Sequence, residues 1–328
     1  MQKVAIVGAG HMAKVHAAAY ANMLNAEPVA IMDIREDAAN ELATAHDAQT
    51  FTDFDEMLKT AKPDVIDVCV PTPWHKEYVV KAALAGKHVV TEKPMARTLD
   101  DCREMIEATK KAGVTFMVAH VLRYFPEFAA AKAQIDAGAV GNPAVVRTTR
   151  GGGFPRAWND WYGNYDWSGG VALDLIIHDF DWLRWCFGDA ERVFAKGLVD
   201  RGLKHLDYAL VTIRFKSGVI AHVEGTWANP AGFAVKFEVA GDKGLLDFHN
   251  KTAVPLMIAR KETEAHRPGV AIPESPTAQN PYFLELEHFI DCVETGKKPS
   301  ITPEDGLRAV EISLAALESI RTGKPITL

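Results

Sequence analysis

The sequence predicts an α/β protein of two domains: an N-terminal doubly wound parallel sheet and a C-terminal α+β domain with mostly antiparallel strands. Three observations support this prediction. The length of 328 residues suits two domains better than one. Strand-like and helix-like segments alternate over residues 1–120, and after residue 120 the pattern changes to runs rich in Val, Ile, Phe and Thr.

The first half alternates short apolar runs with amphipathic segments. Gly86 and Gly113 each end a helix, and Asp100 and Asp101 lie near the positive end of the helix that Gly113 ends. The expected strands are 4–7, 28–32, 65–70, 88–91 and 115–119, and the expected helices are 12–24, 36–46, 53–60 (started by Asp53), 74–85 and 99–112. Strands separated by helices in this way form a parallel sheet covered on both faces.

The second half opens with a helix at 124–137, followed by Gly-rich and aromatic segments. Lys216-Ser-Gly218 and Gly241-Asp-Lys-Gly244 each join two strands by a tight turn, which indicates antiparallel pairing. The expected strands are 193–197, 208–215, 219–227, 234–240 and 244–248; the expected helices are 171–187, 283–294 and 304–321, and residues 251–280 are expected to form loops with one strand. We therefore expect domains at 1–121 and 122–328.

Composition excludes several classes of protein. The formal net charge is -7 and no basic block occurs, which argues against nucleic acid as a partner. Apolar runs are shorter than the roughly 18 residues that a membrane span needs, and the chain enters a strand directly where a signal peptide would have a longer apolar region. The four cysteines are widely spaced, without a metal-type pair, so reduced thiols, no metal site and a cytoplasmic location are expected.

A glycine-rich turn between the first strand and helix is typical of dinucleotide binding. Gly8 permits a tight turn, Gly10 lets the backbone approach a pyrophosphate, and the small Ala13 lets the helix pack on the strand. Asp33 closes the second strand 20 residues after Ala13, where an acid that binds the ribose hydroxyls belongs. This favours NAD over NADP, although Arg35 could neutralise the difference. The alternative is an ordinary tight turn.

A lysine and a helical Asp/His pair could transfer a proton. Lys93 follows a buried strand and precedes a proline, which places it at the carboxyl end of a parallel strand, where open α/β sheets bind ligands. Asp174, His178 and Asp181 share one face of the predicted helix, where an acid one turn before a histidine can fix its tautomer. The alternatives are a surface lysine and a histidine buried in the core.

Two further segments are candidates. His75 opens the helix after the third strand and either caps that helix or touches a nicotinamide. Residues 151–167 contain three of the seven tryptophans, together with Arg156, Asn159, Asp160 and Asn164. Aromatic faces combined with polar groups would suit a sugar ring; a packing or subunit-contact loop is the alternative.

The chain resembles the glucose-fructose oxidoreductase / inositol dehydrogenase (Gfo/Idh/MocA) family over nearly its whole length. The motifs that carry the resemblance are Gly8-Ala-Gly10 with Ala13, Pro71-Thr-x-x-His75, Ala85-Gly-Lys-His-Val-Val-Thr-Glu-Lys93-Pro94, Arg123-Tyr-x-Pro126, Gly169-Gly-x-x-x-Asp174-x-x-x-His178 and Pro303-Glu-Asp-Gly-Leu-Arg-Ala. The Glu-Lys-Pro element is the most specific of them. The aromatic loop at 151–167 matches no particular subfamily.

The resemblance implies a Rossmann domain, a second domain with an open, largely antiparallel sheet, and NAD(P) at the carboxyl edge of the first sheet. It implies that Lys93 is the active-site lysine and that Asp174 and His178 are the acid and the histidine of the second domain. In such enzymes the histidine takes the hydroxyl proton while hydride moves to the nicotinamide. The open sheet would serve as the interface of a homodimer or homotetramer.

The expected function is an NAD-preferring dehydrogenase of a cyclic polyol or pyranose sugar, with NADP possible. The catalytic candidates are Lys93, Asp174 and His178; the cofactor candidates are Gly8, Gly10, His11, Met12, Ala13, Asp33, Arg35, Pro71, Thr72, His75, Glu92 and Lys93; the substrate candidates are Lys93, Arg123, Arg156, Trp158, Asn159, Trp161, Asp174 and His178. The rival functions are a glycosidase that oxidises and re-reduces its sugar without net use of NAD, and a dinucleotide-bound regulator without catalysis.

Overall fold

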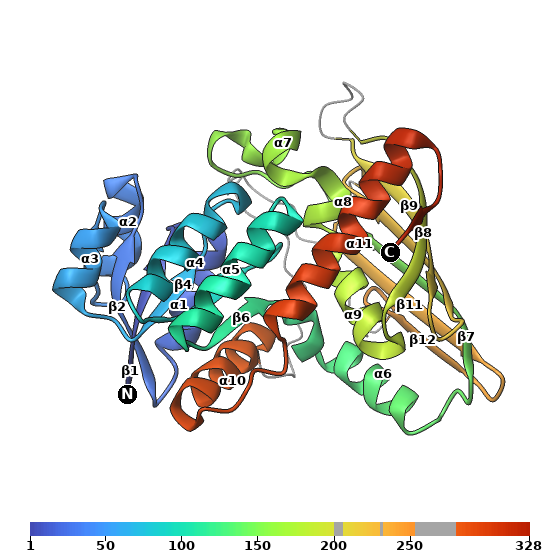
Figure 1. The fold of residues 1–328 in the computed structure, drawn as a ribbon, viewed down its shortest axis with the longest axis horizontal. Coiled ribbons are helices and arrows are strands. Elements are labelled where there is room, and N and C mark those ends of the chain that lie inside the picture. The colour runs from blue at the N-terminus through green and yellow to red at the C-terminus, as the bar shows by residue number, and fades with distance from the viewer. Residues whose placement is uncertain (200–205, 230–231, 253–279) are drawn as a thin grey trace. The chain divides into compact units, whose positions relative to one another are not determined.

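The computed structural model describes residues 1–199, 206–229, 232–252 and 280–328 (Figure 1). The chain divides into two compact units. The first comprises Met1–Tyr124 and Ser275–Val310, and the second comprises Phe125–Glu274 and Glu311–Leu328. Most of the predicted loop and strand at 251–280 lies outside the described residues.

The first unit contains a six-stranded sheet in the order β3-β2-β1-β4-β5-β6, with every neighbouring pair parallel. The strands are β1 (Gln2–Val7), β2 (Ala26–Met32), β3 (Gln49–Phe51), β4 (Val65–Val68), β5 (His88–Glu92) and β6 (Phe116–Ala119). The predicted doubly wound parallel sheet is confirmed. Strand β3 was not predicted from the sequence, because this short edge strand has only one buried residue, Phe51.

Helices connect these strands. They are α1 (His11–Tyr20), α2 (Glu36–Thr44), α3 (Phe54–Ala61), α4 (His75–Leu84) and α5 (Leu99–Ala112), and α4 and α5 lie side by side (Figure 1). Asp53 caps α3 by accepting the Glu56 N–H, as predicted, and Thr98 caps α5 by accepting the Asp101 N–H. Gly113 ends α5 in the left-handed conformation, at φ 68°.

Helix α10 (Pro281–Thr295) packs against α1 in the first unit. Its Leu286, Phe289 and Ile290 share one hydrophobic cluster with the small Ala13 and Ala17 of α1. Small residues on α1 let the larger side chains of α10 approach closely, and burial of those side chains holds the helix there. The predicted domains, 1–121 and 122–328, are two continuous segments, and α10 belongs to the second of them. The contacts instead group α10 with the first unit.

The second unit contains a seven-stranded sheet in the order β12-β11-β7-β10-β9-β8-β13. The strands are β7 (Pro143–Gly151), β8 (Ala190–Gly197), β9 (Tyr208–Phe215), β10 (Ile220–Thr226), β11 (Ala234–Gly241), β12 (Leu245–His249) and β13 (Ile326–Thr327). Only β7 and β10 pair in parallel, so the predicted mostly antiparallel sheet is confirmed. Strand β7 was not predicted from the sequence, although it is an interior strand of the sheet between β11 and β10.

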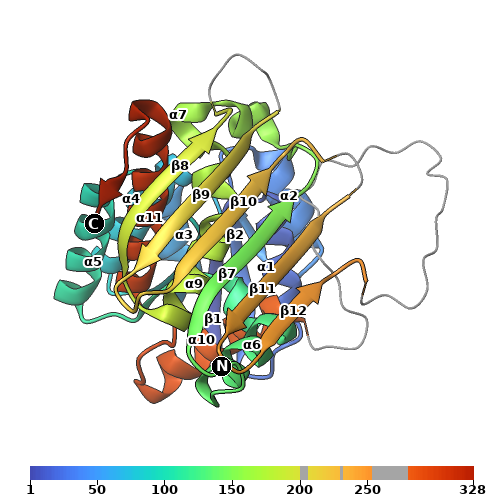
Figure 2. The ribbon, with the colours of Figure 1, turned by 90° about the vertical axis from the view of Figure 1, so that its right-hand side faces the viewer.

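The strands of this sheet alternate between a buried and an outward face. Ala209 and Val211 are fully buried, whereas the intervening Leu210 is 44% exposed. Figure 2 shows the outward face turned toward the viewer, and no helix of the described residues covers it. The helices of this unit are α6 (Pro126–Asp136), α7 (Tyr165–Ser168), α8 (Gly170–Asp174) and α9 (Ile177–Phe187), and α11 (Pro303–Thr322) begins in the first unit and ends in the second.

The predicted single helix at 171–187 is wrong, because the chain forms two helices, α8 and α9, that are separated at Leu175–Ile176. The cause lies in the sheet. Ile176 packs against the bare backbone of Gly225 in β10, where an added Cβ would stand 2.5 Å from Ile176 Cγ2. This close approach brings the chain down onto the sheet and interrupts the regular helix.

Within the described part of the chain, no helix is both long and apolar enough to cross a bilayer.

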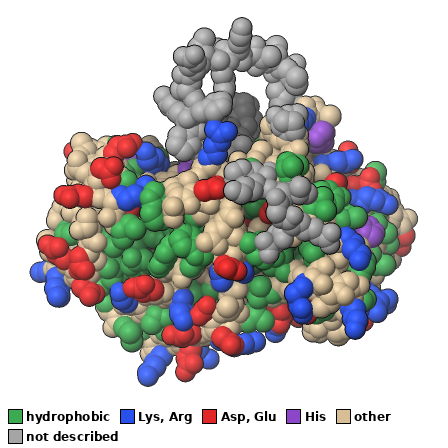
Figure 3. Space-filling model, turned by 90° about the horizontal axis from the view of Figure 1, so that it is seen from above, with side chains coloured by type: hydrophobic (Ala, Val, Ile, Leu, Met, Phe, Trp, Pro, Cys, Tyr) green, Lys and Arg blue, Asp and Glu red, His purple; other side chains and the backbone are tan. Residues whose placement is uncertain are grey.

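Acidic and basic side chains are interspersed over the face shown in Figure 3. All four cysteines are free, and three of them are buried, as the composition predicted.

Candidate active site

The two glycines of the turn after β1 have different structural roles. Gly8 has φ +105°, and a Cβ there would lie 2.6 Å from the backbone oxygen of Cys69, so the fold itself requires glycine. Gly10 has no atom within 4 Å of its ideal Cβ position. Ala13 is completely buried where α1 packs on the sheet. The open space at Gly10, at the N-terminus of α1, therefore fits an approaching pyrophosphate.

Substitution of the two glycines separates these roles. Gly8→Ala should lower the free energy of unfolding by about 1–3 kcal/mol or more. The alanine would have a left-handed φ, and its Cβ would clash with the backbone of Cys69. Gly10→Ala should change stability by less than about 0.5 kcal/mol and weaken NAD binding about tenfold or more, which corresponds to about 1.4 kcal/mol. Thermal unfolding and NAD titration of both variants test this, and equal NAD affinity in Gly10→Ala and the wild type would contradict it.

Asp33, which directly follows β2, accepts hydrogen bonds from Ala9 and Arg35. Its Oδ2 accepts the Ala9 N–H at 2.8 Å, and the Arg35 guanidinium donates to both oxygens at 3.0 and 2.9 Å. Burial tends to raise the pKa of Asp33, but the hydrogen bonds from Arg35 and Ala9 outweigh it and lower the pKa. Asp33 is therefore an anion fixed beside the glycine turn, with Arg35 already turned toward it.

His75 is buried at the first residue of α4, just after the 3-10 turn Thr72–Trp74. Its Nδ1 lies 2.9 Å from the Pro94 carbonyl oxygen and its Nε2 lies 2.8 Å from that of Val70. Both ring nitrogens lie within hydrogen-bond distance of a main-chain carbonyl oxygen. Burial lowers the pKa of the ring, and the neutral ring has one N–H, which donates to one of these two carbonyls. This geometry favours a structural role at the helix start over contact with a nicotinamide.

Lys93 follows β5 directly, at the carboxyl end of the parallel sheet. Its main-chain N–H donates to Glu92 Oε2 at 3.1 Å. Because β1, β4 and β5 are parallel neighbours, their carboxyl ends lie at one edge of the sheet. The glycine turn after β1, Pro71 and Thr72 after β4, and Lys93 after β5 therefore share this edge.

In the second unit, Asp174 is the last residue of α8 and His178 is the second residue of α9. Asp174 is 7% exposed and His178 is half-buried. The break between the helices means that the two residues do not share one continuous helix face. Asp181 is buried, and Asp179 points to a different partner, since its Oδ2 accepts from Arg150 Nε at 2.6 Å.

The aromatic loop is ordered by its own contacts. The rings of Trp161 and Tyr162 stack with centroids 3.9 Å apart, and the Ser168 hydroxyl donates to the Tyr162 carbonyl at 2.9 Å. Asn159 and its neighbour Asp160 adopt left-handed φ angles of 55° and 47°. Three of the substrate candidates on this loop are exposed to solvent: Arg156, Trp158 and Asn159.

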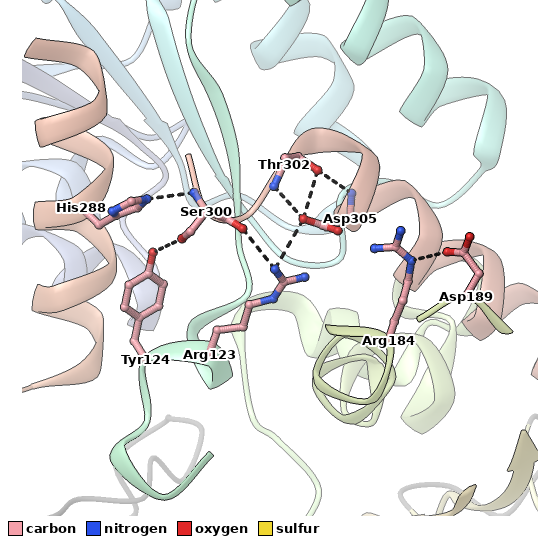
Figure 4. Close-up of polar contacts among 8 residues, drawn as sticks. All are labelled: Arg123, Tyr124, Arg184, Asp189, His288, Ser300, Thr302 and Asp305. Atoms are coloured by element: carbon pink, nitrogen blue, oxygen red, sulfur yellow. Dashed lines mark hydrogen bonds and ion pairs between the residues drawn. The ribbon is translucent and has the colours of Figure 1, made fainter. Parts of the chain in front are cut away.

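Arg123, a substrate candidate, is 7% exposed and lies in a polar network of the first unit (Figure 4). It donates to the Ser300 carbonyl at 3.2 Å and lies 3.5 Å from Asp305 Oδ2. Tyr124 makes a hydrogen bond of 2.9 Å with the Ser300 hydroxyl. These contacts favour a structural role in fastening the segment before α11. No local sequence pattern predicts this network, because Arg123 and Tyr124 are far in the sequence from Ser300 and Asp305.

Two family models together match nearly the whole chain. One, described as the NAD-binding Rossmann fold of an oxidoreductase family, matches residues 2–120. The other, described as the C-terminal alpha/beta domain of the same family, matches residues 132–328. The chain belongs to the Gfo/Idh/MocA oxidoreductase family. It is an NAD-binding oxidoreductase with the Rossmann domain and the second α/β domain of that family.

Individual relatives share the fold and differ in substrate. The chain is 30% identical to the myo-inositol 2-dehydrogenase of Thermotoga maritima, over 99% of this chain and 98% of the relative. It is also 30% identical to the 1,5-anhydro-D-fructose reductase of Ensifer adhaerens, over 99% and 98%. The crystal structure of GenD2 from gentamicin A biosynthesis, in complex with NAD, superposes with a TM-score of 0.90 at 26% identity, over 100% and 96% of the two chains.

Proposed function

We propose that this member of the family is an NAD-preferring dehydrogenase that oxidises a ring hydroxyl of a cyclic polyol or a pyranose sugar. The observation that carries the proposal is the position of Lys93 on the same sheet edge as the glycine turn and Asp33. A cationic side chain on the cofactor edge of a Rossmann sheet is well placed to bind the oxygen of the reacting carbon.

The residues of the chain fit the cofactor. Gly10 leaves the space that a pyrophosphate needs, the N-terminus of α1 offers main-chain N–H groups to it, and the ionised Asp33 can accept hydrogen bonds from ribose hydroxyls. When bound, NAD supplies the nicotinamide ring that accepts the hydride.

In the proposed mechanism each side chain has one task. The Lys93 ammonium donates a hydrogen bond to the substrate oxygen and lowers the cost of the negative charge that develops on it. His178 takes the hydroxyl proton, and Asp174 orients the imidazole and stabilises its charged form.

The exposed aromatic loop supports the proposed class of substrate. Trp158 is 42% exposed and has the polar Arg156 and Asn159 as near neighbours in the sequence. An aromatic face covers the C–H face of a sugar or inositol ring, while amide and guanidinium groups bind its hydroxyls. The inositol dehydrogenase and the anhydrosugar reductase among the relatives agree with this class without selecting one member of it.

Reduced-nicotinamide absorbance tests the proposal directly. The protein receives NAD or NADP with a panel of inositols, free pyranoses and glycosides. A rise in absorbance with one polyol or sugar is expected, and it would be faster with NAD. Glycoside cleavage without net NADH would indicate the redox-neutral glycosidase instead, and NAD binding without any turnover would indicate a regulator.

Asp33→Asn tests the cofactor preference. The variant keeps an acceptor for the Ala9 N–H and loses the negative charge that repels a 2′-phosphate. The ratio of kcat/KM for NAD to that for NADP should fall about 10–100-fold, since hydrogen bonds to charged groups contribute about 1.5–3 kcal/mol. Arg35→Ala is the matched control and should retain the preference for NAD. An unchanged ratio in Asp33→Asn would exclude Asp33 as the determinant.

We also propose that the outward face of the seven-stranded sheet joins subunits into a homodimer or homotetramer. Leu210, Ile220 and Leu245 are exposed on these strands at 44%, 38% and 57%. Exposed apolar side chains on an uncovered sheet are typical of a subunit contact. The molar mass in solution, compared between the wild type and Leu210→Lys/Ile220→Lys, measures whether this face holds the subunits together.

A further inference from the structure

A buried group of ionisable side chains lies in the first unit, beside the strands that carry the cofactor edge. His16 of α1 is completely buried, and each of its ring nitrogens faces a carboxylate. Nδ1 lies 2.8 Å from Asp67 Oδ2, and Nε2 lies 3.1 Å from Glu92 Oε1. Asp67 is completely buried in β4, and Glu92 is 7% exposed at the end of β5. The proposed mechanism gives His16 and Asp67 no task.

The two contacts fit a doubly protonated ring, because Nδ1 lies at hydrogen-bond distance from Asp67 and Nε2 lies at ion-pair distance from Glu92. Burial tends to lower the pKa of His16, but the charge of Asp67 and the influence of Cys69 outweigh it and raise the pKa well above its ordinary value. Burial tends to raise the pKa of Glu92, yet the hydrogen bond and charge of His16 lower it. One imidazolium thus compensates two buried carboxylates that would otherwise repel each other.

This bridge continues to the main chain of the proposed active-site lysine. Glu92 uses Oε1 for His16 and Oε2 to accept the Lys93 N–H at 3.1 Å. On the other side of the lysine, the Pro94 carbonyl lies 2.9 Å from His75 Nδ1. The segment Glu92–Pro94 is therefore contacted by a buried histidine at each end: His16 at Glu92 and His75 at Pro94.

We propose that His16 is a positioning residue for Lys93 and acts through Glu92. The proposal rests on the proposed function of Lys93. His16 fixes the rotamer of the Glu92 carboxylate, and that carboxylate fixes the peptide from which the Lys93 side chain emerges. A lysine on a peptide held in this way presents its ammonium in one place before substrate arrives, which is the condition for orientation to contribute to catalysis.

A metal ion is the competing explanation for this cluster, since donor atoms of His16, Asp67 and Cys69 all lie within 4.8 Å of one another. The contacts favour protons instead. The separation of 2.8 Å between His16 and Asp67 is a hydrogen-bond distance, and the Cys69 thiol lies 3.3 Å from Asp67 Oδ1, in position to donate. Burial and the charge of Asp67 raise the pKa of Cys69, which keeps the thiol protonated.

The variants His16→Gln and Glu92→Gln test the proposal on the full-length protein. Both should lower kcat by up to about 10²-fold, the size of effect that a misplacement of about 1 Å produces. The dissociation constant of His16→Gln for NAD, measured by titration without substrate, should stay within about threefold, because His16 is completely buried and does not belong to the glycine turn. Glu92→Gln keeps the size of the side chain and serves if His16→Gln fails to fold.

The double variant His16→Gln/Glu92→Gln gives the decisive comparison. If His16 acts through Glu92, the double variant should be no slower than the slower single variant. A loss of kcat in the double variant equal to the product of the two single losses would overturn the proposed route. Wild-type kcat in both single variants would overturn it as well. Lys93→Ala serves as the reference: if it abolishes turnover while the His16 variants do not, only the positioning role is excluded, whereas full activity of Lys93→Ala would exclude the proposed function itself.

His88→Gln is the matched control, because His88 begins the same strand that Glu92 ends. Its Nδ1 accepts the Thr115 N–H at 3.0 Å, and the ring is half-buried. The same substitution here should leave kcat unchanged. Metal analysis of the purified protein completes the test: one equivalent of tightly bound zinc that disappears in His16→Gln would overturn the proton-bridged arrangement.

The pH dependence of stability provides a readout without turnover. A histidine whose pKa is raised by folding stabilises fully below its ordinary value of 6.5, and this contribution is lost as the pH rises through the higher folded value. The gap in Tm between the wild type and His16→Gln should therefore be wide at about pH 6 and shrink toward about pH 10. A gap that does not narrow would exclude the imidazolium bridge. The other titratable groups around the cluster are Tyr20 of α1, Cys69, His75 of α4 and Glu285 of α10.

Discussion

Lys93→Ala is expected to lower turnover by about 10²–10⁴-fold, the usual contribution of one acid or base group, while NAD binding is retained. Lys93 follows β5 at the cofactor edge, and alanine removes the cation that would hold the substrate oxygen. The glycine turn and Asp33 lie on other strands and stay in place. Steady-state turnover and NAD titration of the same preparation measure both parts of the expectation.

Lys87→Ala is the control for this experiment, since Lys87 lies just before the same strand, at its opposite end. It should retain turnover within about twofold, because a partly exposed lysine away from the site contributes little. Turnover of Lys93→Ala equal to the wild type would remove Lys93 from the mechanism. Loss of NAD binding together with turnover would indicate instead that the lysine serves the cofactor.

Asp179→Ala is expected to destabilise the second unit by about 3–5 kcal/mol, the usual cost of leaving one partner of a buried ion pair uncompensated. Arg150 on β7 and Asp179 on α9 are 4% and 0% exposed, and they join at 2.6 Å. The Arg150 guanidinium also lies over the Phe128 ring, 5.8 Å from its centroid. Thermal unfolding should show a decrease in Tm of about 6–20 °C for a domain of this size.

The double variant Arg150→Met/Asp179→Leu distinguishes the stability that the ion pair itself contributes from the cost of the unpaired charge that a single substitution leaves behind. Replacing both partners with apolar side chains should recover most of the lost stability, because desolvation of the two charges offsets much of their attraction. Asp189→Ala is the exposed comparison: this residue pairs with Arg184 at 3.0 Å near the surface (Figure 4), and its loss should cost less than about 1 kcal/mol. Equal costs for Asp179→Ala and Asp189→Ala would refute the role of burial.

Local sequence signals were sufficient for most of the first unit. The parallel strands are short, mainly apolar runs, and Asp53 and Gly113 act on residues within one turn of the helices that they start and end. The glycine turn, Asp33 and Lys93 could be placed for the same reason, since each follows directly from the end of a strand. The roles of the glycine turn, Asp33 and Lys93 in binding and catalysis belong to the proposed function.

The sequence by itself thus determined the fold class, the family and the edge of the sheet that carries the candidate cofactor residues, because periodicity and short motifs are properties of neighbouring residues. Only the tertiary structure decided which distant segments meet. Gly225 of β10 interrupts the helix at Ile176, α10 packs on α1, and His16 joins Asp67 to Glu92. These contacts depend on burial and on close approach between residues far apart in the chain, which no local pattern encodes.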